Sequence, residues 1–330
     1  MREAALVVQI DRGFPLVETA DGRRFRCKHA VALVKGADMR AQVGDRVQVE
    51  VAEDADIAQI AEIEPRTREL VRRDPAERTV AQVLAVNFDA VIVAPPVHEL
   101  NERRLERELV LAQSTGAHVV VALTKADLAE SPDQVDAVRD HVRAMAAPGV
   151  DVVVVSERRP ESIERLRAFI PAGTVAVLIG RSGVGKSSLV NLLAGSEVQE
   201  TSAVRATDGK GRHTTVNRSM VALPGGGYVV DMPGVRGLGL WDSREGIDAA
   251  FPDVAGPAAD CRFRDCTHTN EPGCAVQAAV AAGTLSPERV ASYVRLVTEN
   301  AEQQERNEVE KLLESTDVQL WLAGHEHENL

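Results

Sequence analysis

Aromatic side chains and long apolar runs are scarce in this chain of 330 residues. It has six Phe, two Tyr and two Trp, which together make up 3% of the residues, although 44% are hydrophobic. No apolar run approaches the roughly 20 residues that a membrane-spanning helix needs, and the start, MREAALVVQIDRG, is charged too early for a signal peptide. We therefore expect a soluble, cytoplasmic, globular protein of two or three domains.

Cysteine is also scarce, and its distribution is uneven. Cys27 stands alone, whereas Cys261, Cys266 and Cys274 lie close together. This spacing argues against a secreted disulfide framework. It favours one metal cluster near the C-terminus and one ordinary, half-buried thiol.

The chain lacks an excess of positive charge, because its formal net charge is -12. Taken alone, this average argues against a nucleic-acid partner, since phosphate binding needs cations. Basic residues nevertheless gather in residues 66–78, 101–107, 204–213 and 261–265. Each cluster is either a solvated face or a contact for RNA, and the sequence leaves both interpretations open.

The first 65 residues alternate short polar and apolar stretches. The runs ALVVQI, FPLVET, RRFRCK, DRVQVEV and IAQIAEI are separated by DRG, ADG and VGD, which are typical of turns. Five short strands predict an OB-fold barrel over residues 1–65. Its only aromatic residues are Phe14 and Phe25, so contact with an RNA backbone or a protein fits better than base stacking.

After EPRTRELVRRDPAERT, which we interpret as a linker, the pattern changes to strand and helix. Val-rich runs such as AVIVAPP, HVVVALT and TVAVLIG are typical of a buried parallel sheet. They alternate with helical segments, one of which Asn101 can cap. We expect a doubly wound α/β domain over residues 66–242. Residues 243–330 then hold a Cys/His segment, a long helix and a frayed tail, and form a mostly helical third domain.

The segment TVAVLIGRSGVGKSSLVNLL combines an apolar strand, a glycine-rich loop and a helix. Gly180, Gly185, Lys186 and Ser187 match the phosphate-loop pattern GxxxxGKS. In such a loop the backbone N–H groups surround the β-phosphate, the lysine reaches the β and γ oxygens, and the serine hydroxyl ligates Mg²⁺. The segment predicts nucleotide binding.

The motif TKAD, residues 124–127, follows the strand HVVVAL and so lies where ligands of open α/β sheets bind. It resembles the guanine-reading NKxD motif of GTPases. Asp127 would accept hydrogen bonds from the guanine N1–H and amine, while the stem of Lys125 covers the ring. Thr124 stands in the place of Asn and loses the amide.

Further motifs complete a GTP site. DMPG matches the γ-phosphate-reading DxxG, with Asp231 holding Mg²⁺ through water and the Gly234 N–H meeting the phosphate. In GRHTTV, one of Thr214 and Thr215 could ligate Mg²⁺. Ser156 ends another strand and could offer its backbone N–H to the guanine oxygen.

The order of these motifs is unusual. Ordinary GTPases place the phosphate loop and DxxG before the base-reading motif, whereas here residues 124–156 precede residues 180–234. The order predicts a circularly permuted GTPase, in which the segment after DMPG leads into the C-terminal Cys/His module. A movement of that loop that depends on the γ-phosphate would then be transmitted to the Cys/His module. Val235 stands where Ras-like enzymes carry the water-orienting glutamine, so we expect slow intrinsic hydrolysis.

The C-terminal cluster has the spacing C-x4-C-x-H-x5-C. Cys261, Cys266, His268 and Cys274 supply three thiolates and one imidazole, which complete a closed tetrahedral zinc shell. Such a shell leaves no position for water, so we expect one structural zinc ion per chain.

Together, VNFDAVIV, TKAD, GRSGVGKSSLVN, GRHTT, DMPG and FPDVAGPAADCRFRDCTHTNEPGCAV resemble the ribosome small-subunit-dependent GTPase A family, the circularly permuted YjeQ-type GTPases. The resemblance covers nearly the whole chain. It implies late maturation of the 30S subunit, contact with 16S rRNA and ribosomal proteins, and GTP hydrolysis stimulated by the subunit. It also implies a catalytic role for His213 beside Lys186.

The alternative to such a GTPase is an RNA-binding assembly scaffold that uses nucleotide mainly for its structure. Intact Lys186, Ser187 and Asp231 oppose that alternative, and TKAD opposes an ATPase or kinase. We expect a monomer that binds GTP or GDP with magnesium and does not bind membranes. The predicted nucleotide contacts are Thr124, Lys125, Asp127, Ser156, Gly180, Ser182, Gly183, Val184, Gly185, Lys186, Ser187, Ser188, Thr214, Thr215, Asp231 and Gly234, with Ser187 and Thr215 as magnesium ligands.

Overall fold

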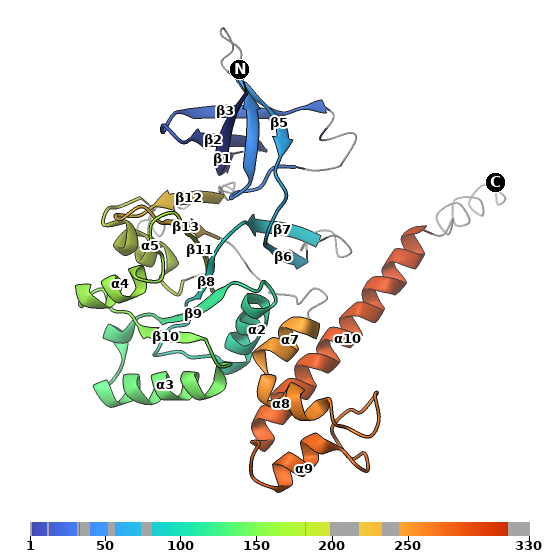
Figure 1. The fold of residues 1–330 in the computed structure, drawn as a ribbon. Coiled ribbons are helices and arrows are strands. Elements are labelled where there is room, and N and C mark those ends of the chain that lie inside the picture. The colour runs from blue at the N-terminus through green and yellow to red at the C-terminus, as the bar shows by residue number, and fades with distance from the viewer. Residues whose placement is uncertain are drawn as a thin grey trace, which may run out of the picture. The chain divides into compact units, whose positions relative to one another are not determined.

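The computed structural model describes residues 2–11, 13–31, 33, 40–51, 57–73, 81–181, 183–198, 218–232 and 244–315 (Figure 1). The chain forms two compact units. One consists of Met1–Leu70 and Val83–Arg236, and the other of Val71–Gln82 and Gly237–Leu330. The predicted boundaries of three domains stay a prediction.

The N-terminal strands close into a barrel. They are β1 (Arg2–Asp11), β2 (Phe14–Thr19), β3 (Arg24–His29), β4 (Arg46–Glu50) and β5 (Ala58–Ile63). The strands pair in the order β1-β2-β3-β5-β4, and β4 returns to β1, so no edge is left open within this set. Alternate side chains such as Val7, Val17 and Val47 point into the barrel core. The predicted barrel of five strands is confirmed.

The second part of this unit is a sheet of mostly parallel strands. They are β8 (Ala90–Val93), β9 (His118–Leu123), β10 (Asp151–Val154), β11 (Val175–Ile179), β12 (Arg218–Ala222) and β13 (Tyr228–Asp231). Their order is β10-β9-β8-β11-β13-β12, in which only β12 runs antiparallel. The central strands β8 and β11 are buried along their whole length, which explains their continuous runs of apolar residues. Strand β10 forms one edge.

The barrel and the sheet are continuous in hydrogen bonding. Strand β1 pairs with β12 through Gln9 opposite Ser219 and Ile10 opposite Arg218, which produces one 11-stranded sheet. The segment that we predicted as a linker contains β6 (Glu69–Arg73), which pairs with β7 (Ala81–Val86). That prediction was wrong because the charged residues of ELVRR hide a short strand.

Helices cover both faces of the parallel sheet. They are α2 (Glu102–Gln113), α3 (Pro132–Met145), α4 (Pro160–Arg167) and α5 (Lys186–Ala194), with a short 3₁₀ helix at Ala126–Leu128. Helices α4 and α5 share one core with Ile92 and Leu178 of the sheet, and α2 packs on β8 and β9 from the other side (Figure 1). The predicted cap is present, since Asn101 Oδ1 accepts the Arg104 N–H at 3.0 Å. The doubly wound α/β fold is confirmed.

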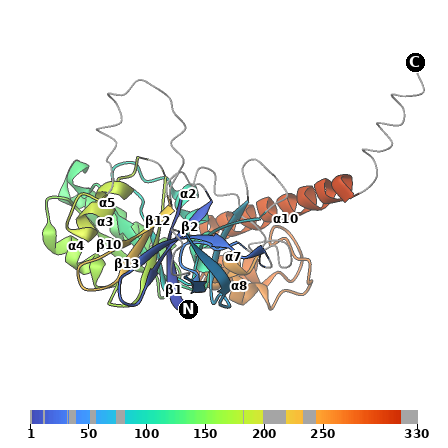
Figure 2. The same cartoon turned by 90° about the horizontal axis from the view of Figure 1, so that it is seen from above.

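The second unit is mostly helical. It contains α7 (Arg244–Ala250), α8 (Pro252–Ala258), α9 (Ala275–Ala281) and α10 (Pro287–Ser315). Phe251, Val254 and Tyr293 are buried in its core. Helix α10 extends well beyond the other three helices in both views (Figures 1 and 2). None of the helices in the described ranges combines the length and the apolar character that crossing a bilayer requires.

Candidate functional site

The phosphate loop connects β11 to α5. Gly180, Gly183 and Gly185 have φ angles of +151°, +85° and +95°, which glycine adopts without strain. A side chain at Gly180 would also bring its Cβ to 3.1 Å from the Ala94 carbonyl oxygen. The loop therefore has the backbone that surrounds a phosphate group, and α5 begins at its end with Lys186. Ser182 lies outside the described residues.

Lys186 lies over this loop and is only 8% exposed. Its Nζ donates to the carbonyl oxygens of Gly180 at 2.7 Å and Arg181 at 3.0 Å. Burial lowers the pKa of Lys186, while the negative charges of Asp231 and Glu108 oppose that shift. The ammonium group is thus held beside the backbone groups that would receive phosphates.

Strand β13 brings the DMPG segment to the same end of the sheet. It pairs in parallel with β11, so that Asp231 lies opposite Leu178, two residues before Gly180. Asp231 is buried, and Ser187 is the second residue of α5. A carboxylate and a hydroxyl are oxygen donors of the kind that Mg²⁺ prefers. His213, Thr214, Thr215, Gly234 and Val235 lie outside the described residues.

The TKAD segment is hydrogen-bonded to the phosphate loop. The Thr124 hydroxyl is buried and donates to the Val184 carbonyl oxygen at 2.9 Å. Lys125 has a left-handed backbone, and its Nζ donates to the Gly183 carbonyl oxygen at 2.8 Å. Two neighbouring residues of the predicted base-reading motif therefore touch the loop predicted to hold the phosphates.

A cavity of about 170 Å³ lies where these two segments meet. Asp127 contributes a carboxylate to its wall, Val155 and Leu189 contribute apolar surface, and Ser188 lines it beside the loop. Glu157 also lines the cavity, and an apolar slot edged by carboxylates suits a flat base that carries N–H donors. Ser156 is not part of this lining: its N–H donates to Ser162 Oγ at 3.1 Å, and its predicted contact with guanine stays a prediction.

The predicted cysteine and histidine ligands come together in the second unit. The Sγ atoms of Cys261 and Cys266, the Sγ of Cys274 and a ring nitrogen of His268 lie within 4.8 Å of one another. His268 Nδ1 is 3.6 Å from both Cys261 Sγ and Cys274 Sγ, and these two sulfurs are 3.9 Å apart. Zn–S bonds of about 2.3 Å and Zn–N bonds of about 2.0 Å give tetrahedral edges of about 3.5 to 3.8 Å. The donor set therefore fits a tetrahedral metal ion.

Within one basic cluster, the structure corrects the interpretation of Arg66. Arg66 is only 14% exposed, and its Nε and Nη2 each bond a carboxylate oxygen of buried Asp45 at 2.9 Å. This bidentate pair is part of the barrel wall and is neither a solvated face nor a free RNA contact. Of Arg72 and Arg73 the structure describes the backbone alone.

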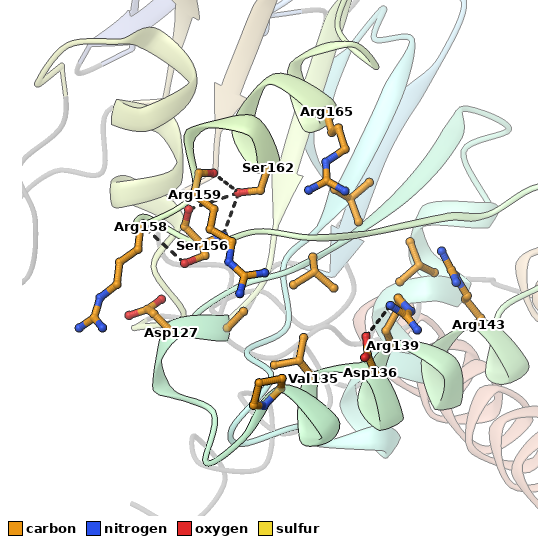
Figure 3. A pocket seen from close by; sticks show the side chains of 15 residues that line it. Asp127, Val135, Asp136, Arg139, Arg143, Ser156, Arg158, Arg159, Ser162 and Arg165 are labelled. Atoms are coloured by element: carbon orange, nitrogen blue, oxygen red, sulfur yellow. Dashed lines mark hydrogen bonds and ion pairs between the residues drawn. The ribbon is translucent and has the colours of Figure 1, made fainter.

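The sequence interpretation missed another basic cluster. Five arginines line a groove beside β10, as Figure 3 shows for Arg139, Arg143, Arg158, Arg159 and Arg165. The run SERRPESIERLR carries three of them, but α3 and α4 bring the two groups together. Composition could have pointed to that run, whereas the groove itself depends on the packing of both helices.

Comparisons with known proteins match these features. The family model described as "RsgA GTPase" matches residues 63–241, and one described as "50S ribosome-binding GTPase" matches residues 175–323. A Streptomyces coelicolor protein named "Small ribosomal subunit biogenesis GTPase RsgA" is 43% identical over 297 residues, which are 89% of this chain and 79% of that protein. Its namesake from Streptomyces avermitilis is 43% identical over 300 residues, 90% of this chain and 79% of that protein.

Two solved structures are also similar. The structure of YjeQ from Thermotoga maritima has a TM-score of 0.70 and 27% identity, and the match covers 91% of this chain and 99% of that one. YloQ, described as a circularly permuted GTPase, has a TM-score of 0.66 and 24% identity over 92% of this chain and 96% of that one. At that identity the second match supports the fold alone.

Proposed function

The chain belongs to the RsgA GTPase family and is a GTP hydrolase with a circularly permuted GTPase domain, and from this premise we propose that it acts in late maturation of the small (30S) ribosomal subunit. In this proposal it binds the subunit, and the bound subunit stimulates hydrolysis of GTP to GDP and phosphate. Relatives with 43% identity over about nine tenths of this chain carry the name of small-subunit biogenesis GTPases. The GTP site itself is supported by the hydrogen bonds of Thr124 and Lys125 to the phosphate loop.

The residues of the site have separate roles in this proposal. The backbone of the loop from Gly180 to Ser188 binds phosphate oxygens, and Lys186 neutralises their charge. Asp127 accepts the guanine N1–H and amine, which an adenine ring does not offer in that arrangement. Ser187 and Asp231, together with one of Thr214 and Thr215, would hold magnesium. When bound, that ion offsets the charge of the β- and γ-phosphates.

The proposed hydrolysis depends on a residue that replaces the usual glutamine. Val235 cannot orient a water molecule, because its side chain has no donor or acceptor. The family resemblance gives that role to His213. Slow turnover by the free protein and fast turnover on the subunit follow if the subunit positions His213.

The other parts of the chain would serve binding. We propose domain boundaries at residues 1–65, 66–242 and 243–330, zinc as the metal of the Cys₃His cluster, and a cytoplasmic monomer. Three thiolates and an imidazole favour zinc over hard cations such as Mg²⁺ or Ca²⁺, which prefer oxygen donors. The partners would be 16S rRNA and ribosomal proteins of the subunit.

Phosphate release tests the proposal directly. It would be measured from GTP and from ATP, each with and without purified 30S subunits. We expect slow turnover of GTP, a many-fold increase with the subunit, and no turnover of ATP. GTP turnover that is indifferent to 30S subunits would contradict the proposed partner.

A variant of the phosphate loop separates this function from an assembly scaffold. Lys186→Ala should lower turnover by at least about 100-fold because the phosphate charge is no longer offset. Lys28→Ala, at an exposed position of β3, is the control. If Lys186→Ala bound 30S and completed subunit maturation as well as the unaltered chain, the scaffold alternative would be correct.

A further inference from the structure

A groove of about 590 Å³ runs beside the edge strand β10, between α3 and α4. Val152, Val153 and Val154 of the strand form its floor. Arg139 and Arg143 reach it from α3, and Arg159 and Arg165 from the side of α4 (Figure 3). We call it the arginine groove. It is separate from the cavity proposed for the base, although Asp127 lines both.

The guanidinium groups of the arginine groove are only partly neutralised. Arg139 pairs with Asp136 at 2.6 Å and with Asp140 at 2.9 Å, and Arg143 lies 3.7 Å from Asp140. Asp127 also lines the groove, near Arg158 and Arg159 (Figure 3), but Arg158, Arg159 and Arg165 form no ion pair with any residue in the described ranges. In a chain with a net charge of -12, this is a local surplus of positive charge.

The chemistry of the groove favours phosphates as its ligand. Arginine presents a planar fork of donors that binds two phosphate oxygens at once, and here such forks stand on both walls. None of the side chains that line the groove is aromatic, so it offers neither a stacking surface for bases nor an aromatic anchor for a peptide. A chain of phosphates can contact several arginines in turn, whereas a single small anion would leave most of them unused.

We propose that the arginine groove binds the phosphate backbone of an RNA segment. The inference rests on the proposed function, because a ribosomal subunit would present such a backbone. It goes beyond that function by assigning the contact to Arg139, Arg143, Arg158, Arg159 and Arg165, which lie outside the basic clusters that the sequence indicated.

The same loop borders both the arginine groove and the base cavity. Val155 and Glu157 line the base cavity, whereas Ser156, Arg158 and Arg159 line the groove. The Arg158 N–H also donates to Ser156 Oγ at 3.2 Å, which keeps the loop compact. Binding of RNA to these arginines would therefore move the shared loop and alter the wall of the base cavity. RNA and guanine nucleotide should alter each other's affinity by the same factor.

The binding test uses the full chain and a fluorescently labelled single-stranded RNA of mixed sequence. Arg159→Gln/Arg165→Gln should weaken binding about tenfold and lower the slope of log affinity against log salt by roughly 1.4, or about 0.7 for each phosphate that is no longer neutralised. For a charge-matched comparison, Arg159→Gln alone is set against Arg306→Gln on α10, whose side chain is 64% exposed. Arg306→Gln should leave the slope unchanged. An unchanged slope in the groove variants would overturn the inference.

Two further measurements keep the test independent of folding in the variants. In the unaltered protein, RNA should slow the modification of Arg159 and Arg165 by phenylglyoxal, and polyglutamate should not. RNA should also change the dissociation rate of a fluorescent GDP analogue at least threefold, and this change should disappear in Arg159→Gln/Arg165→Gln. Protection by polyglutamate but not by RNA would overturn the inference in favour of an acidic protein partner.

Failure of this inference is distinguishable from failure of the proposed function. If 30S subunits stimulate the unaltered chain and the groove variants bind RNA normally, only the arginine groove is refuted. If 30S subunits neither bind nor stimulate the unaltered chain, the proposed partner is wrong. The RNA and phenylglyoxal measurements still decide whether the groove binds a phosphate backbone.

Discussion

The hydroxyl of Thr124 connects the segment proposed to read the base to the phosphate loop. From the sequence alone, Thr124 differs from the Asn of the NKxD motif only by the loss of the side-chain amide. In the structure the hydroxyl donates to the Val184 carbonyl oxygen, and a weaker contact of 3.3 Å reaches the Pro95 oxygen. The side chain is 5% exposed, so water does not replace these bonds easily. Threonine thus keeps the link between the two segments.

We predict that Thr124→Val weakens binding of GDP about tenfold. Valine has nearly the same shape but no donor, so the buried carbonyl of Val184 loses its partner at a cost of about 1 to 3 kcal/mol. Fluorescence titration with a labelled GDP gives the affinity. Thr124→Ser keeps the hydroxyl and should bind nearly as well as the unaltered chain. Equal affinity of the Val and Ser variants would show that the bond is dispensable.

We expect His29 to make the stability of the barrel depend on pH. Burial lowers the pKa of His29, nearby Arg40 lowers it further, and Asp45 opposes both. Its Nε2 accepts the Ala41 N–H at 2.8 Å, which requires the unprotonated nitrogen. The unfolded chain therefore binds a proton more readily than the folded chain. Stability falls as the pH drops below the unfolded value of about 6.5 and recovers as it rises.

We expect His29→Gln to reduce this acid sensitivity, because an amide can accept the same hydrogen bond without titrating. Hydrogen exchange of the barrel amides over a pH series, corrected for intrinsic exchange, measures the effect. His141→Gln, a partly exposed histidine of α3, should leave the pH profile of the barrel unchanged. Identical profiles for His29→Gln and the unaltered chain would assign the pH effect to other groups.

The backbone at Gly44, just before β4 of the barrel, approaches the end of β7 closely. Its φ is +97°, and a Cβ there would lie 2.1 Å from the Val86 carbonyl oxygen. The Gly44 carbonyl accepts from Asn87 Nδ2 at 3.1 Å, and its N–H donates to the Val7 oxygen at 2.9 Å. Only glycine fits this position, because both the conformation and the space exclude a side chain.

We predict that Gly44→Ala destabilises this unit by at least about 3 kcal/mol, through backbone strain together with the clash at Val86. Gly22→Ala is the matched control, since Gly22 also has a positive φ of +82° but no atom near its Cβ site. It should cost only about 1 kcal/mol. Thermal melting of both variants tests the difference, and equal melting temperatures would refute the role of the close contact.

At the scale of the whole molecule, the sheet brings together motifs that occur in permuted order along the chain. The segments proposed to read the base and to bind the phosphates are far apart along the chain. They follow β9 and β11, which β8 alone separates in the sheet, and they bond each other directly. The family model and the similar solved structures agree with this arrangement. The acidic average of the chain likewise hides a locally basic groove.

The Cys₃His cluster gives a prediction for the second unit. Cys266→Ser should reduce the metal content from one ion per chain to nearly none and should destabilise α8 and α9, because metal binding contributes to folding there. Elemental analysis by mass spectrometry and hydrogen exchange measure the two effects. Cys27→Ala removes the thiol of the barrel core and should keep one ion per chain. Equal metal content in the two variants would contradict the assignment.

The sequence alone determined the elements and the motifs. Periodicity located the barrel strands and the Val-rich sheet strands, because local patterning reports which side chains must be buried. Spacing predicted the phosphate loop, the TKAD motif and the metal ligands, because their chemistry depends on a few neighbouring residues. Strand β6 was not predicted, because its charged residues obscure the polar and apolar alternation of a short segment.

Tertiary structure decided which side chains meet. Arg66 belongs to a basic run, yet its ion pair with Asp45 depends on a residue 21 positions earlier. The bond from Thr124 to Val184 spans 60 positions, and the arginine groove needs both α3 and α4. Such contacts depend on the packing of segments that are distant along the chain, so the local sequence does not predict them. The motifs were therefore predictable, whereas the connection between the base cavity and a basic groove became visible only in the folded chain.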